Sequence, residues 1–163
     1  MGTPLITMEP PSSRIECLNQ SGITIPLHQI GIAVESAFRM HGREDATACL
    51  LLTQDEEIQD LNRRFRSVDS PTDVLTFPSG EHNFLGDVAI SVSYAARQAA
   101  ARGVTLDQEL AFLAIHGALH LLGFDDETEP ERAEMVDQMN RVAISLGLTP
   151  DLEWASILHA EAL

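Results

Sequence analysis

Lysine is absent from this chain of 163 residues, so all ten of its basic residues are arginines. They are outnumbered by 25 acidic residues, which gives a formal net charge of −15. A protein that binds nucleic acid through a broad basic surface needs the opposite balance. The composition therefore argues against a simple nucleic-acid binder and leaves room only for local groups of arginine.

Long apolar runs, a signal sequence and paired cysteines are missing as well. No run approaches the ~20 apolar residues of a membrane-spanning helix, and residues 1–13 lack the basic start and apolar middle of a signal peptide. The two cysteines, Cys17 and Cys49, are far apart and form no CxxC zinc motif. Separate cysteines in predicted strands are typical of reduced cytosolic proteins. We therefore expect a cytoplasmic protein without a membrane partner.

The length and patterning of the chain predict a single α+β domain. A hydrophobic content of 44% in 163 residues is enough for a substantial core. Strand-like and helical segments alternate in the first half, and helices dominate the second. We predict a four-stranded mixed β-sheet covered by about five α-helices. Strands are expected at 13–19, 46–52, 71–78 and 85–92, and helices at 26–40, from 53 onward, 93–101, 105–122 and 128–146.

Hydroxyl side chains mark where four of these helices should begin. In a capping box, a Ser or Thr side chain accepts a hydrogen bond from the backbone three residues later, where a Glu or Gln returns the contact. The pattern therefore predicts helix starts and not helix interiors. The expected caps are Thr53 with Glu56, Thr105 with Gln108, Thr128 with Glu131, and Ser93 on its own.

The strongest chemical signal is the segment His116-Gly-Ala-Leu-His120-Leu-Leu-Gly-Phe-Asp-Asp126. Two histidines four residues apart project from one face of a helix, and this helix is apolar nearly all round, as buried helices are. Buried imidazoles need partners, and one divalent ion satisfies both. Gly123 is expected to end the helix, and the chain that turns back after it carries Asp126. Two His and one Asp leave open coordination positions, as in catalytic zinc sites.

Other interpretations of this segment remain open. A His pair at this spacing also arises by coincidence, and Asp126 can instead favour the N-terminus of the helix that begins near Thr128. Position 117 is Gly, whereas a His-Glu-x-x-His metalloprotease helix carries its general base there. We interpret Gly117 as leaving space beside the metal for a bulky substrate group, which argues against peptidase chemistry.

Four segments, in order along the chain, resemble the YbeY family of bacterial metal-dependent endoribonucleases, which are linked to ribosomal RNA maturation. The resemblance covers roughly residues 15–147, and the family's α+β fold with a mixed sheet agrees with the prediction above. We accordingly divide the chain into a flexible extension at 1–13, a YbeY-like domain at 14–147 and a tail at 148–163, for which a short helix from Asp151 is one option. The segments are LNRRFR (61–66), PTDVLTFP (71–78), LGDV (85–88), and Glu109 followed by HGALHLLGFD (116–125).

Two departures from the family's motifs bear on the site. Asp126 stands where the family has a third histidine, and Ser70 stands where it usually has a lysine. The resemblance implies that His116, His120 and Asp126 hold one divalent ion, with zinc expected first. Because a carboxylate replaces an imidazole, a harder ion such as Mn²⁺ is an alternative.

The resemblance also suggests roles outside the histidine segment. Arg66 matches the family's arginine and is the candidate catalytic residue, because a guanidinium can stabilise charge that develops on a phosphoryl group. The alternative interpretation of Arg66 is a solvated surface side chain that pairs with Asp69. Further candidates are Asp73 and Asp87, which can orient a ligand histidine, and Arg63 and Arg64, which can extend a positive strip for the substrate.

The resemblance implies a single-strand-preferring, metal-dependent endoribonuclease in rRNA maturation and ribosome quality control. Its partners would be single-stranded RNA or rRNA and ribosomal proteins of the small subunit, with no DNA. Three alternatives stay open: a metal-dependent hydrolase of another small or peptide substrate, a ribosome-assembly factor that does not cleave RNA, and a 2-His-1-carboxylate iron oxygenase. The ligands of such oxygenases normally lie on a β-barrel, which argues against the last.

Overall fold

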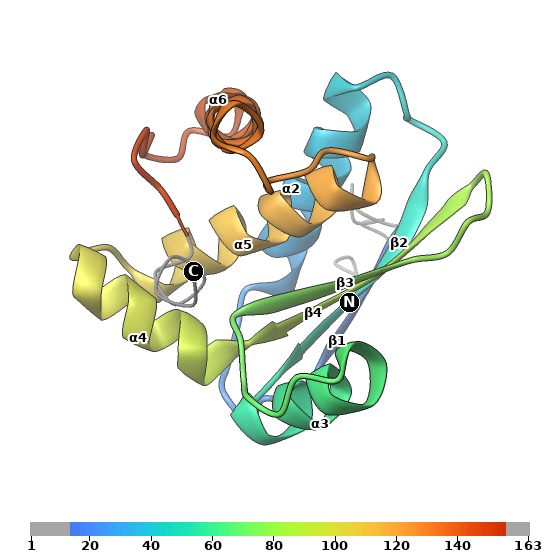
Figure 1. The fold of residues 1–163 in the computed structure, drawn as a ribbon. Helices are drawn as coiled ribbons and strands as arrows, with labels where there is room; N and C mark the ends of the chain where they lie inside the picture. The colour runs from blue at the N-terminus through green and yellow to red at the C-terminus, as the bar shows by residue number, and fades with distance from the viewer. Residues whose placement is uncertain (1–13, 156–163) are drawn as a thin grey trace, which may run out of the picture.

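In the computed structural model, which describes residues 14–155, four strands form one mixed sheet (Figure 1). Its order is β1-β2-β4-β3. The first three of these strands run parallel, and β3 pairs antiparallel with β4 at the edge. The four-stranded mixed sheet of the prediction is therefore confirmed. The strands are β1 (Ile15–Asn19), β2 (Thr47–Thr53), β3 (Val74–Pro78) and β4 (Phe84–Ser91).

Five helices cover this sheet within the described part of the chain, as expected. Three of them, α2, α5 and α6, lie on one side, while α3 lies alone against the opposite face (Figure 1). Helix α4 continues directly from β4 and packs beside α5. The bounds are α2 (Leu27–Met40), α3 (Asp55–Arg66), α4 (Val92–Arg102), α5 (Leu106–Leu121) and α6 (Glu129–Ser145).

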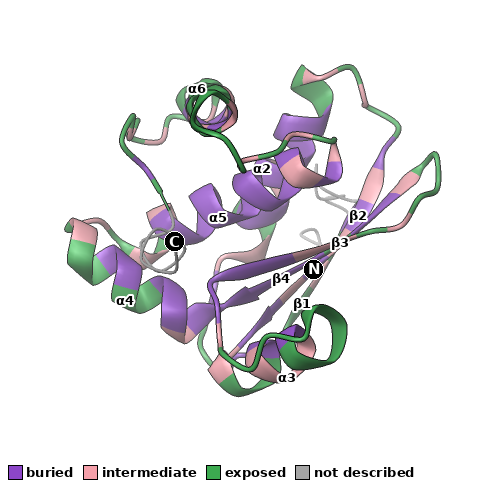
Figure 2. Ribbon diagram, in the orientation of Figure 1, coloured by how far each residue is buried: buried purple, intermediate pink, exposed green. Residues whose placement is uncertain are grey.

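Helix α5 lies in the centre of the core. Apolar side chains along its length, such as Phe112 and Leu119, are buried against α2 and the sheet. Figure 2 shows α5 as buried almost throughout, whereas much of α3 is exposed. A smaller apolar cluster around Ile58 and Leu75 attaches α3 to the other face. A polar side chain on the buried part of α5, from Glu109 onward, must therefore find its partners inside the protein.

Two of the predicted helix caps are confirmed in whole or in part. Thr128 and Glu131 form the complete capping box, with each side chain accepting from the other residue's backbone N–H. The Thr105 side chain accepts from the backbone N–H of Gln108. The box is incomplete, and the Gln108 amide nitrogen instead donates to the backbone carbonyl of Thr149.

The other two predicted caps are wrong, and strand pairing explains the first of them. Thr53 pairs with Ser91 as the last residue of its strand, so α3 begins only at Asp55. The Thr53 hydroxyl donates to the Glu57 carboxylate instead of capping α3. Ser91 caps helix α4, two residues before the predicted cap Ser93, and the helix begins at Val92.

The segment after α6 does not form the expected tail helix in its described part. Residues 152–153 make a turn, and Trp154 packs back into the core. The rest of that expected helix, at 156–163, lies outside the described residues, as does the expected extension at 1–13. Within residues 14–155, no helix combines the length and apolar character needed to cross a membrane.

Candidate metal centre

The end of α5 reverses the chain over its own histidines. Gly123 adopts a φ of +105°, which favours glycine. Its N–H donates to the His120 carbonyl at 3.0 Å, and the N–H of Phe124 donates to the Leu119 carbonyl at 3.0 Å. These bonds close the last helical turn. The chain leaving the turn brings Asp126 back beside the histidine pair.

Three potential ligand atoms form a nearly equilateral triangle there. The Nε2 atoms of His116 and His120 lie 3.1 Å apart. Asp126 Oδ2 lies 3.5 Å from the first nitrogen and 3.4 Å from the second. Ligand atoms bound to one zinc ion at tetrahedral angles, with bonds of about 2.0–2.1 Å, are ~3.4 Å apart. Both the donor types and their spacing therefore fit one divalent ion.

The electrostatics of the triangle also favour a cation. His116 is only 5% exposed, and burial lowers the pKa of its imidazole. Contacts with His116 and His120 hold the pKa of the Asp126 carboxyl well below its usual range. With both neutral imidazoles protonated on Nδ1, the tautomer in which Nε2 can bind a metal, three lone-pair-bearing atoms would face one another, which is unfavourable unless positive charge lies among them. A divalent ion supplies that charge and keeps both imidazoles neutral.

Asp73 lies behind the triangle, whereas Asp87 does not. The buried Asp73 carboxylate accepts from the backbone N–H of Val74 at 2.7 Å, and its charge opposes the effect of burial on the pKa of His116. Asp87 is exposed on β4 and lines a groove on the α3 side of the sheet, together with Cys49. Only Asp73 is thus placed to influence a ligand histidine.

A buried carboxylate, Glu109, occupies the same helix two turns before His116. It is 1% exposed and accepts from Arg102 at 3.0 Å and from Gln98 at 3.2 Å. Burial raises the pKa of Glu109 to about 7. Gln98 also donates to Asp73 at 3.3 Å, so one amide links the two carboxylates.

The sequence reasoning assigned no role to Glu109 or to its neighbour Trp154. The Trp154 indole donates to Glu109 at 3.2 Å, and its ring centroid lies 5.1 Å from that of His116. A glutamate seven residues before a histidine on an apolar helix was a usable signal, because both lie on one buried face. Nothing in the local sequence around Trp154 indicated its position.

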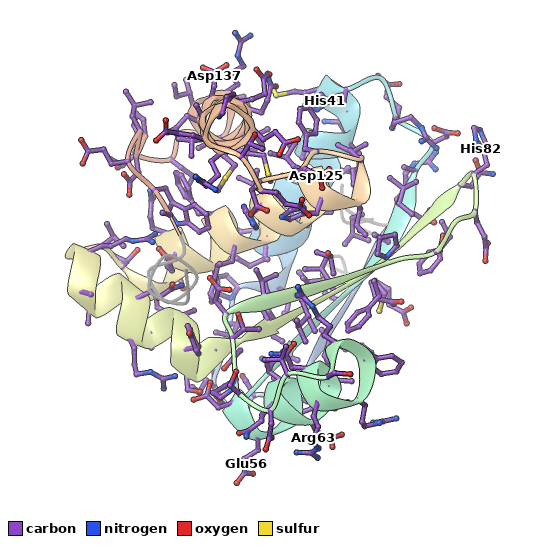
Figure 3. The ribbon with its side chains drawn as sticks, in the orientation of Figure 1. His41, Glu56, Arg63, His82, Asp125 and Asp137 are labelled. Carbon is purple, nitrogen blue, oxygen red and sulfur yellow. The ribbon has the colours of Figure 1, made fainter. Side chains whose placement is uncertain are left out.

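The candidate arginines lie on the far side of the sheet from the triangle. Figure 3 shows Arg63 beneath the sheet on α3 and Asp125 above it, beyond the end of α5. Arg63 pairs with Asp60 at 2.6 Å and with Asp69 at 3.3 Å. Arg64 also pairs with Asp60, at 3.1 Å. These two charges are therefore largely balanced by neighbouring acids.

Arg66 is the last residue of α3, and its side chain is exposed. Its expected alternative partner, Asp69, pairs with Arg63 instead. Among the described residues, no ion pair or hydrogen bond holds the Arg66 side chain. Residues 67–73 connect Arg66 to edge strand β3, which belongs to the sheet that separates α3 from α5.

The interpretation of Gly117 as open space beside a metal is wrong. A Cβ added there would lie 2.7 Å from Val88 Cγ1 and 3.1 Å from Val88 Cγ2. Position 117 therefore faces β4, and glycine is needed so that α5 can approach the sheet closely. The remaining reason against peptidase chemistry is that position 117 lacks the glutamate of a His-Glu-x-x-His metalloprotease helix.

Comparison with known proteins identifies the family. Residues 19–147 match the model of the family described as Endoribonuclease YbeY. The chain belongs to the YbeY family. This match includes all three corners of the triangle and Arg66, but it ends before Trp154.

Individual proteins that resemble this YbeY-family chain support the same family assignment. An Endoribonuclease YbeY of Acholeplasma laidlawii is 39% identical over 109 residues, covering 66% of this chain and 79% of that protein. One of Gloeobacter violaceus is 45% identical over 118 residues, covering 66% of this chain and 60% of that protein. The solution structure of TM1509 from Thermotoga maritima matches with a TM-score of 0.63 at 28% identity, covering 81% and 88% of the two chains.

Proposed function

We propose that this YbeY-family protein is a metal-dependent endoribonuclease that prefers single-stranded RNA and acts in rRNA maturation and ribosome quality control. The observation that carries the proposal is the triangle of His116, His120 and Asp126, whose donor atoms lie 3.1–3.5 Å apart. The family supports RNA as the substrate. Zinc is the expected ion, with Mn²⁺ as the alternative that the carboxylate ligand allows.

Each residue of the triangle would supply one ligand atom to the ion. His116, which is buried, and His120 would hold the ion through Nε2, and Asp126 would hold it through Oδ2. A bound divalent ion polarises a phosphoryl oxygen and makes a coordinated water more acidic. The His120 and Asp126 side chains are 22% and 32% exposed, so the open side of the site faces solvent. A phosphodiester can reach the site from that side.

Arg66 would bind the phosphate from across the edge of the sheet. Its guanidinium offers two parallel N–H groups to a phosphate, and it is not held by a carboxylate in this structure. The hollow beside the loop after α5 is lined by acidic residues, among them Asp125, Glu131 and Glu134. This charge disfavours RNA on the α6 side, so we place the RNA path along β3. A flexible single strand can bend around an edge strand more easily than a duplex can.

The acidic surface away from the site suits basic partners. A net charge of −15 attracts basic proteins electrostatically. We therefore propose ribosomal proteins of the small subunit as contacts during rRNA maturation, and a cytoplasmic location for that work.

The test combines metal analysis with an RNA-cleavage assay on protein purified without chelator. We expect one divalent ion per chain and faster cleavage of a single-stranded oligoribonucleotide than of its duplex. His120→Ala should lose both the ion and the activity, whereas His82→Ala should keep both, because His82 is 84% exposed in the β3–β4 hairpin. Wild-type metal content in His120→Ala would show that the site is wrongly placed. A bound ion without cleavage would favour a ribosome-assembly factor that does not cut RNA.

A further inference from the structure

Trp154, the single tryptophan of the chain, lies beyond the residues that match the family model. It belongs to the segment that follows α6, and this segment is fastened at two points. The Gln108 amide donates to the Thr149 carbonyl at 2.6 Å. Asn140 accepts from the Asp151 N–H at 2.7 Å and donates to the Asp151 carbonyl at 3.0 Å. The segment is thereby held against α5 and α6.

The indole of Trp154 is fixed in place on several sides. It is 4% exposed and stacks on Phe112, with the ring centroids 6.4 Å apart. The Arg102 guanidinium lies over the ring, 4.9 Å from its centroid. The indole N–H donates to Glu109 at 3.2 Å. A flat ring with these contacts has little freedom to turn.

His116 lacks the hydrogen bond that usually orients a metal-ligand histidine. Such a histidine normally donates its second ring N–H to a carboxylate or carbonyl, which fixes the plane of the ring. Here Nδ1 of His116 is buried and has no hydrogen-bond partner among the described residues. The Trp154 ring, 5.1 Å away and tilted by 45°, packs against the His116 imidazole instead.

We propose that Trp154 is a positioning residue for His116: its fixed indole holds the buried imidazole so that Nε2 faces His120 and Asp126. This inference rests on the metal centre proposed above. It assigns a role in the site to the segment after α6, which the family match does not cover.

The test measures zinc affinity by competition with a chromogenic chelator, and it does not depend on RNA cleavage. Trp154→Leu keeps an apolar side chain but removes the flat ring, and its dissociation constant for zinc should rise about tenfold. Trp154→Phe keeps a flat ring but loses the N–H donor to Glu109, so its dissociation constant should rise less than that of Trp154→Leu. The matched control is Ile58→Ala, in the separate apolar cluster under α3, which should lower the melting temperature without changing zinc affinity.

A second variant keeps the proposal testable if Trp154→Leu fails to fold. Asn140→Ala leaves the indole in the chain but releases the Asp151 backbone, so Trp154 emission should shift to the red and zinc affinity should fall. Titration with Co²⁺ should quench the Trp154 fluorescence of the wild type at one equivalent, and not that of His116→Ala.

The outcomes separate this inference from the proposed function. A folded Trp154→Leu with the wild-type dissociation constant would overturn the positioning role while the metal centre stands. A red shift of the Trp154 emission in Asn140→Ala with unchanged zinc affinity would also overturn the positioning role. A wild-type protein that shows no stoichiometric quenching and binds no zinc would overturn the metal centre itself, and the positioning role with it.

Discussion

Asp126 reaches the histidine pair because the chain reverses at Gly123, and its Oδ2 lies 3.4–3.5 Å from both imidazole nitrogens. Those distances place a carboxylate where the family motif is expected to carry a third histidine. An anionic ligand lowers the net charge of a metal centre and raises the pKa of the bound water. We therefore expect the side chain at this position to influence both metal choice and the pH range of activity.

Exchanging the side chain at position 126 tests its ligation. Asp126→Asn should weaken zinc binding, because the neutral amide lacks the charge of the carboxylate. Asp126→His should keep zinc binding or tighten it, because imidazole is a good zinc ligand. Both constants come from chelator competition. If Asp126→Asn binds zinc as tightly as the wild type, Asp126 serves only the turn that precedes α6.

Arg66 differs from Arg63 and Arg64 because no acid within residues 14–155 pairs with its guanidinium. Arg66→Ala should keep the metal and the melting temperature but lower cleavage by roughly 10²-fold, the effect of losing one transition-state donor. Arg66→Lys should restore only part of the rate, because an ammonium lacks the bidentate fork. Arg141→Ala, which removes an exposed arginine paired with Asp137 on α6, is the control. An unchanged kcat/KM in Arg66→Ala would return Arg66 to the solvated surface.

At the scale of elements, α5 both fills the core and carries two of the three proposed ligands. The two roles are compatible because its polar side chains meet partners inside the protein. His116 and His120 face Asp126, and Glu109 faces Arg102. The close approach of α5 to β4 at Gly117 sets the height of the histidines above the sheet.

Gly117→Ala tests that close approach. Alanine stabilises a helix interior by about 1 kcal/mol relative to glycine, but its Cβ would overlap the branched Val88 side chain, and overpacking costs about 1–3 kcal/mol. We expect a net loss of stability on the order of 1 kcal/mol, measured by urea unfolding. Ala100→Gly, at an exposed position of α4, calibrates the intrinsic helix preference. A Gly117→Ala variant more stable than the wild type would show that α5 can shift freely.

At the scale of the whole molecule, charge limits how RNA can be held. The net charge is −15, and Arg63 and Arg64 are paired with acids, so few cations remain for phosphates. Each phosphate neutralised on a single strand adds about −0.7 to the slope of log K against log salt. With three arginines at most, the slope should not be steeper than about −2.

Fluorescence anisotropy of a labelled single-stranded RNA, measured across a salt series, gives this slope. Arg66→Ala should make it shallower, while Arg141→Ala should leave it unchanged. A slope near −4, which corresponds to about six phosphates, would require a basic surface that the described residues do not show.

Much of the fold could be predicted from local patterns. Strand-like alternation, helical periodicity and the Thr128 capping box are properties of neighbouring residues, so the mixed sheet and its helices followed from them. The start of α3 could not be predicted, because the pairing of Thr53 with Ser91 between distant strands extends β2 to Thr53 and removes that residue as a helix cap. Long-range pairing outweighed local preference at that position.

The sequence by itself determined the histidine pair, the glycine stop and the returning aspartate, because helical spacing and a positive φ at Gly123 are local requirements. Only the tertiary structure decided the rest. It placed the arginines of α3 on the other face of the sheet, turned Gly117 toward Val88, and packed Trp154 against His116. These contacts join residues far apart in the chain, and they depend on how helices and strands pack around one core, which no local spacing encodes.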